Sequence, residues 1–132
     1  MNIKEISKQI NQNAIEKGFW DDEQQNENPA AISAFMCQKI LLIVSEVTEA
    51  MEADRKGRVC TANMNSINGW VYDVDFIPSF QEHVKDTLQD ECADIAIRLF
   101  DFCEHYEIDL EAHIIAKHRY NTTRPVKHGK NY

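Results

Sequence analysis

Residues 45–58 read SEVTEAMEADRKGR and residues 89–102 read QDECADIAIRLFDF. Each stretch carries two acids three positions apart among apolar residues: Glu46 with Glu49, and Glu91 with Asp94. Residues three apart project from one side of a helix, so each pair forms one acidic face. Burying such charges costs several kcal/mol unless a cation pairs with them. Because few bases lie nearby in the sequence, the pattern predicts a hard divalent cation such as Mg²⁺, held by carboxylate oxygens.

The apolar residues around these acids repeat at helical spacing. They are Met36, Ile40, Ile43, Val47, Ala50 and Met51 in the first segment, and Val84, Leu88, Ile95, Leu99 and Phe102 in the second. At about 100° per residue, Glu46 falls on the margin of the first stripe. Glu91 falls inside the second stripe with Asp94 at its edge, whereas Glu49 lies farther round. A solvated charged face would lie opposite the stripes, so these positions favour a functional site.

Length and composition predict one soluble domain spanning residues 1–132. The chain has 132 residues, of which 43% are hydrophobic and 27% charged, an ordinary globular composition. No apolar run approaches the roughly 20 residues that span a bilayer, and MNIKEISKQINQN lacks the apolar centre of a signal peptide, so we expect a cytoplasmic protein with no membrane partner. The cysteine spacings favour reduced thiols over the alternative, a zinc site shared with His105 or His113.

The net charge of −8 is unevenly distributed. Residues 117–132, KHRYNTTRPVKHGKNY, carry five bases and no acid, which leaves −13 for residues 1–116. An acidic body argues against nucleic-acid binding, which needs a broad basic face. This basic end of the chain includes the tail at residues 121–132. It suits the binding of a small polyanion between metal ions on one side and Lys or Arg side chains on the other. The alternative is a solvated, disordered tail.

Capping and breaking residues predict an all-α fold, a bundle of four helices without a strand of consequence. We expect helices over residues 3–17, 29–56, 79–106 and 109–120, with a polar loop at 19–28 and an irregular insertion at 57–78. Ser79 and Glu82 have the spacing of a capping box, and Asp109 can cap the fourth helix. Facing helices of a bundle can build a metal site from inward carboxylates.

These segments, taken in order, resemble the MazG-like nucleoside triphosphate pyrophosphohydrolases over nearly the whole chain. The resemblance is carried by AIEKGFWDD, LLIVSEVTEAMEADRKGR, VKDTLQDECADIAIRLFDF, IDLEAHIIAKHRYNTTRP and KHGKNY. E-x-x-E alone is a weak signal, but joined in this order to YNTTRPVKHGK it is specific. The stretch between the two acidic pairs is longer than in compact members of the family. We therefore expect the insertion at 57–78 to influence substrate choice.

The resemblance implies an enzyme that hydrolyses nucleoside triphosphates between the α and β phosphates, giving a nucleoside monophosphate and pyrophosphate. Non-standard or surplus deoxynucleotides are candidate substrates. It implies that Mg²⁺, with Mn²⁺ as a substitute, is held by Glu46, Glu49, Glu91 and Asp94. Such an ion would neutralise the acids and lower the pKa of a bound water. Glu49, the acid farthest from its stripe, is our candidate for accepting the proton of that water.

Further residues are candidates for binding the substrate. Those that match the family's phosphate-binding end are Lys117, Asn121, Arg124 and Lys130. Lys117 and Asn121 are four apart and share a helix face. Lys85 and Lys56 are either additional phosphate contacts or members of surface salt bridges. Trp20, Phe19 and Tyr120 either stack on a base or form aromatic cover for the bundle.

The competing function is a non-catalytic helical module that binds a metal, a nucleotide or a basic partner. A carboxylate-bridged di-iron bundle is disfavoured, because neither acidic pair supplies the Glu-x-x-His that it needs. The two acidic helices would be roughly 40 Å long and carry apolar residues off their main stripes: Leu41, Val44, Ile97 and Phe100. We therefore expect a homo-oligomer, a dimer or dimer of dimers, which the resemblance also implies.

Overall fold

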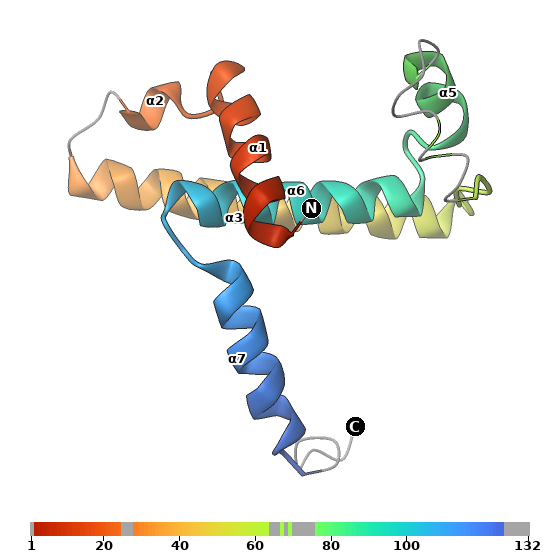
Figure 1. The fold of residues 1–132 in the computed structure, drawn as a ribbon. Coiled ribbons are helices and arrows are strands. Elements are labelled where there is room, and N and C mark those ends of the chain that lie inside the picture. The colour runs from red at the N-terminus through yellow and green to blue at the C-terminus, as the bar shows by residue number, and fades with distance from the viewer. Residues whose placement is uncertain (1, 25–27, 64–66, 68, 70–75, 126–132) are drawn as a thin grey trace. The chain divides into compact units, whose positions relative to one another are not determined.

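The computed structural model describes residues 2–24, 28–63, 67, 69 and 76–125, and every regular element in this part is a helix (Figure 1). The helices are α1 (Ile3–Glu16), α2 (Asp21–Gln24), α3 (Pro29–Arg55), α5 (Phe76–His83), α6 (Leu88–His105) and α7 (Leu110–Thr122). The all-α prediction is confirmed for the described residues. The chain divides into two compact units, residues 23–99 and residues 1–22 with 100–132. The assignment of one domain stays a prediction.

The unit of residues 23–99 contains α3, the first long acidic helix. The Asn28 side chain caps it by accepting a hydrogen bond from the Ala30 N–H at 3.0 Å, and Pro29 occupies the first turn. At the other end, Gly57 has a φ of 65°, which lets the Arg58 N–H return to the Ala53 carbonyl at 2.9 Å. The predicted bounds of this helix are therefore confirmed to within a residue.

The single helix predicted over residues 79–106 is wrong, because the chain forms α5 and α6 with a turn between them. Ser79 lies inside α5 rather than at its cap. Asp86 has a φ of 59°, a left-handed conformation that interrupts the helix. Its N–H donates to Asp90 Oδ2 at 2.9 Å, and Thr87 Oγ1 donates to the Val84 carbonyl at 2.6 Å. These local side-chain bonds hold a turn that competes with helix continuation.

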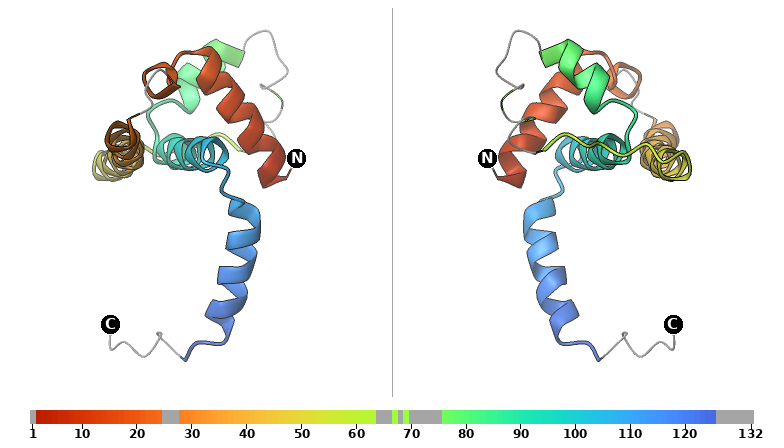
Figure 2. Two further views of the ribbon diagram at one scale, coloured as in Figure 1. Left: turned by 90° about the vertical axis from the view of Figure 1, so that its left-hand side faces the viewer. Right: turned by 90° about the vertical axis from the view of Figure 1, so that its right-hand side faces the viewer.

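The predicted insertion at 57–78 is closed at its base by two hydrogen bonds. The Leu88 N–H donates to the Arg58 carbonyl at 2.8 Å, and the Cys60 N–H donates to Gln89 Oε1 at 2.9 Å. Residues 58–63 form no helix or strand, whereas α5 begins at Phe76, inside the predicted insertion; 64–66, 68 and 70–75 lie outside the described residues. Within this unit, α3 and the first part of α6 run side by side and antiparallel (Figures 1 and 2).

The other unit is built around Trp20, which is only 1% exposed. Its indole stacks on His105, with ring centroids 3.5 Å apart and 5° between the planes, and it meets the edge of Tyr106. Asp101 Oδ1 accepts hydrogen bonds from Trp20 Nε1 at 3.1 Å and from Asn11 Nδ2 at 2.8 Å. One carboxylate of α6 thereby joins α1 and the turn that follows α1.

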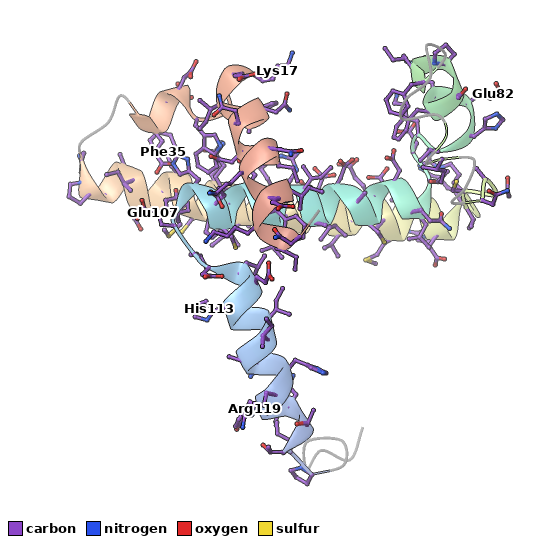
Figure 3. The ribbon with its side chains drawn as sticks, viewed as in Figure 1. Lys17, Phe35, Glu82, Glu107, His113 and Arg119 are labelled. Atoms are coloured by element: carbon purple, nitrogen blue, oxygen red, sulfur yellow. The ribbon has the colours of Figure 1, made fainter. Side chains whose placement is uncertain are left out.

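Capping residues also set the ends of α1 and α7. Asn2 and Glu5 form a capping box at the start of α1, and the helix gives way to Gly18 with a φ of 77°. The one-turn helix α2 occupies part of the predicted polar loop. Asp109 accepts a hydrogen bond from the Ala112 N–H at 3.0 Å, so the predicted cap of α7 is confirmed. His113 and Arg119 project from α7 into solvent (Figure 3).

The cysteines agree with the sequence analysis, whereas the apolar character of α3 does not. All four cysteines are free thiols, as predicted: Cys37, Cys60, Cys92 and Cys103. In contrast, α3 is long and apolar enough by length and composition to cross a membrane, although we expected no run of that length. The core helix of a soluble protein meets the same criterion. A cytoplasmic location without a membrane partner therefore stays a prediction.

Replacing Asp101 by Ala should remove the oxygen that accepts hydrogen bonds from both Trp20 and Asn11. Because Trp20 Nε1 and Asn11 Nδ2 would both lose their partner, the free energy of unfolding should fall by about 2–3 kcal/mol. Urea denaturation followed by Trp fluorescence measures the change. Glu104→Ala on the same helix is the control, since no side-chain bond ties Glu104 to another described residue. Equal losses in the two variants would contradict the role given to Asp101.

Candidate metal centre

Three acids from two helices converge in the unit of residues 23–99. Glu46 of α3 and Glu91 and Asp94 of α6 place carboxylate oxygens within 4.8 Å of one another. Glu46 is 5% exposed and Glu91 6% exposed, whereas Asp94 is half-buried. The structure thus brings together three of the four residues that the sequence analysis assigned to the metal.

The local sequence explains why these side chains meet. Glu46, Ala50 and Ala53 follow one another at spacings of four and three, so they lie on one face of α3, and all three are buried. The alanines leave space on that face for a close neighbour. Glu91 lies in the first turn of α6, where the positive end of the helix dipole favours a carboxylate.

Glu91 is the strongest sign of a ligand at this position. Its side chain is buried, and the described residues provide it with neither a hydrogen-bond donor nor an ion-pair partner. Burial raises the pKa of Glu91 above the usual range, and neighbouring acids, with Glu49 first, raise it further. Buried polar groups are nearly always satisfied. A carboxylate left open and directed at two others is the arrangement expected for a hard divalent cation.

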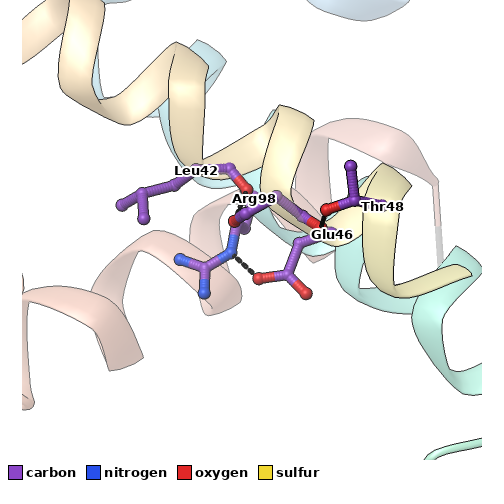
Figure 4. Close-up of polar contacts among 5 residues, drawn as sticks. Leu42, Glu46, Thr48 and Arg98 are labelled. Carbon is purple, nitrogen blue, oxygen red and sulfur yellow. Dashed lines mark hydrogen bonds and ion pairs between the residues drawn. The ribbon is translucent and has the colours of Figure 1, made fainter. Parts of the chain in front are cut away.

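A cation from the chain itself borders the cluster. Arg98, one turn after Asp94 on α6, donates a hydrogen bond from Nε to Glu46 Oε1 (Figure 4). Burial, Asp90 and Glu46 raise the pKa of Asp94, while the charge of Arg98 lowers it. Three ionised carboxylates and one guanidinium leave a charge of −2, which one divalent cation balances. The sequence analysis missed Arg98, although its i,i+4 spacing from Asp94 could have indicated it.

Glu49, the fourth predicted ligand and the candidate base, does not belong to the three-residue cluster. It is exposed on α3. Among the neighbouring charges, that of Glu49 contributes most to the raised pKa of Glu91, so it lies near the cluster. An exposed carboxylate beside three converging acids has room for a water molecule. Its roles as ligand and base stay predictions.

The predicted phosphate-binding residues lie at the end of α7, in the other unit. Lys117 Nζ lies 5.1 Å, and the guanidinium carbon of Arg124 6.0 Å, from the centroid of the Tyr120 ring, which is itself exposed. Asn121 Oδ1 is buried and has no hydrogen-bond partner in the described part of the chain. Lys130 lies outside the described residues. The structure therefore places two of the candidate substrate residues, Lys117 and Arg124, over the ring of a third, Tyr120.

The remaining candidates have the following surroundings in the structure, and their substrate-binding roles stay predictions. Trp20 is covered by His105 and Tyr106, so its indole presents no free face to a base here. Phe19 is exposed. Two lysines form exposed ion pairs, Lys85 with Asp86 at 4.0 Å and Lys56 with Glu52 at 3.3 Å. Such pairs contribute little to stability.

Replacing Glu91 by Gln should stabilise the metal-free protein at neutral pH. An acid whose pKa is raised by folding favours the folded state below the ordinary carboxyl range, and that contribution is lost as the pH rises through the raised value. In chelator, the free energy of unfolding of Glu91→Gln should therefore exceed that of the parent at pH 7 and match it near pH 4. Urea denaturation at both pH values tests this, with the exposed Asp54→Asn on α3 as control. A parent as stable as the variant at pH 7 would contradict it.

The case for a metal centre therefore rests on side-chain geometry. Oxygen donors converge from α3 and α6, and Glu91, a buried residue, has no hydrogen-bond donor or ion-pair partner among the described residues. The surrounding charge suits a divalent cation. Comparisons of the chain with protein-family models, characterised proteins and solved structures find no match.

Proposed function

We propose that this protein is a metal-dependent nucleoside triphosphate pyrophosphohydrolase of the MazG-like kind. It would cleave between the α and β phosphates and release a nucleoside monophosphate and pyrophosphate. The observation that carries the proposal is the convergence of Glu46, Glu91 and Asp94. Glu91 is buried and has no hydrogen-bond donor or ion-pair partner among the described residues. Non-standard or surplus deoxynucleotides are the substrates that we would test first.

The donor set fits Mg²⁺, with Mn²⁺ as a substitute, because all the converging atoms are carboxylate oxygens. When bound, such an ion neutralises polyphosphate charge and acidifies a coordinated water. Glu46, Glu91 and Asp94 would hold the ion. Glu49, exposed near the cluster, would accept the proton of the attacking water.

The end of α7 supports a polyanionic substrate. Lys117 and Arg124 share the exposed ring of Tyr120, and neither is paired with an acid among the described residues. Two unneutralised cations at one place attract phosphate groups. Asn121 and Lys130 complete the set of substrate residues in this proposal.

Turnover distinguishes the enzyme from the non-catalytic metal- or nucleotide-binding module. The purified chain, incubated with Mg²⁺ and a panel of ribo- and deoxynucleotides, should release pyrophosphate. Glu49→Gln should lower this rate by at least about a hundredfold, the usual effect of losing a general base, while Mg²⁺ still binds by calorimetry. Glu52→Gln is the control, because this half-buried acid of the same helix pairs with Arg55 and Lys56 and does not belong to the cluster. Binding of Mg²⁺ without pyrophosphate release from any nucleotide would favour the module.

We also propose that the chain forms a homo-oligomer through its apolar helix faces. On α3 several apolar side chains are between 42% and 65% exposed: Ile40, Leu41, Val44, Val47 and Met51. Soluble proteins rarely leave such a surface open. Light scattering at micromolar concentration should give a mass of two or four chains, and Leu41→Glu should reduce it, whereas Val59→Glu outside α3 should not. A parent mass of 15.3 kDa, that of one chain, would contradict the proposal.

A further inference from the structure

We propose that Arg98 is a phosphate-binding residue of the metal centre, anchored on Glu46 through Nε and contacting a metal-bound polyphosphate through its two Nη groups. The inference rests on the proposed metal centre. It adds to the predicted substrate residues one that comes from α6 itself.

The hydrogen bonds of Arg98 leave most of its donors open. Nε donates to Glu46 Oε1, while no other described residue accepts from Nη1 or Nη2. The Glu46 side chain is 7% exposed, but that of Arg98 is 39% exposed. The guanidinium is therefore held through Nε, on a side chain that remains partly exposed to solvent.

The mode of pairing distinguishes this arginine from a simple counter-charge. A guanidinium that only neutralises a carboxylate does so best through two parallel hydrogen bonds. Here a single bond holds the guanidinium through Nε, and neither Nη group has an acceptor among the described residues. Two free Nη groups form a fork that matches phosphate geometry. Because the anchor already restricts the side chain, less conformational entropy is lost when an anion binds.

The position of Arg98 puts the open fork beside the cluster. Arg98 follows Asp94 by one helical turn on α6 and donates a hydrogen bond to Glu46, so the guanidinium borders two of the three acids. A polyphosphate that coordinates a metal ion at the cluster would still have phosphate oxygens free to accept hydrogen bonds from the protein. Arginine donors at such a place stabilise the charge that develops on phosphate oxygens.

Binding of the metal does not require Arg98 to leave Glu46. A carboxylate has two oxygens with about four lone-pair sites between them. The contact in Figure 4 engages one oxygen of Glu46 and leaves the other open. Glu46 can therefore accept the hydrogen bond from Arg98 with one oxygen and coordinate the cation with the other. Metal-binding carboxylates commonly accept such an additional hydrogen bond.

Calorimetry with Mg²⁺ alone, followed by inorganic pyrophosphate at saturating Mg²⁺, tests the inference without relying on turnover. Arg98→Lys keeps the positive charge but removes the fork. Its affinity for Mg²⁺ should stay within about threefold of the parent, while its affinity for pyrophosphate should fall by about tenfold or more, the effect of losing charge-assisted hydrogen bonds. Arg98→Gln should show a similar loss for pyrophosphate. The control is Arg55→Lys, whose arginine forms an exposed ion pair with Glu52 on α3.

The outcomes separate this inference from the proposed function. Unchanged pyrophosphate affinity in both Arg98 variants would overturn it. Tighter Mg²⁺ binding by about tenfold in Arg98→Lys would also overturn it, because Arg98 would then be a competitor that the metal displaces. A parent that binds no Mg²⁺ would refute the metal centre and the inference with it. A parent that binds Mg²⁺ and pyrophosphate through Arg98 but hydrolyses no nucleotide would refute only the proposed enzyme.

Discussion

Negative charge buried between α3 and α6 is the constraint on which the unit of residues 23–99 depends. Glu46 and Glu91 are both nearly inaccessible, and only Glu46 has a cationic partner, Arg98. The first turn of α6 relieves part of the cost for Glu91 through the helix dipole. The remainder is an unfavourable term in the folded state, and a bound cation would remove it. The position that weakens the metal-free fold is thus the one at which the proposed cation would bind.

Two acids of α6, Asp101 half-buried and Glu91 buried, have opposite surroundings. Asp101 is satisfied by neutral donors, Trp20 Nε1 and Asn11 Nδ2, which converge on a single oxygen. Glu91 has no donor among the described residues and instead meets other acids. The first arrangement is complete without any ligand and stabilises the fold. The second is incomplete, so the contrast within one helix separates a structural acid from a candidate functional one.

Local signals in the sequence predicted much of this fold. Pro29, Gly57 and Asp109 mark helix ends by backbone chemistry that needs no distant partner, and the helices they bound agree with expectation. The break between α5 and α6 was missed because Asp86 adopts a left-handed conformation without being glycine. The pairing of Arg98 with Glu46 joins residues 52 positions apart, so only packing of the two helices reveals it. Periodicity identified which acids face a neighbour, but not which of them would lack a donor.

The hydrogen-bonded base of the insertion has a consequence for how such a protein can change over evolutionary time. Arg58 and Cys60 at the exit of α3 are bonded to Leu88 and Gln89 at the start of α6, so the chain between them leaves and returns at a fixed point. The entropic cost of closing a segment between two fixed ends grows only slowly with its length, by about 0.6 kcal/mol for each doubling. Residues can therefore be gained or lost there while the register between Glu46 and Glu91 is kept, and new contacts to a ligand can arise without rebuilding the acids.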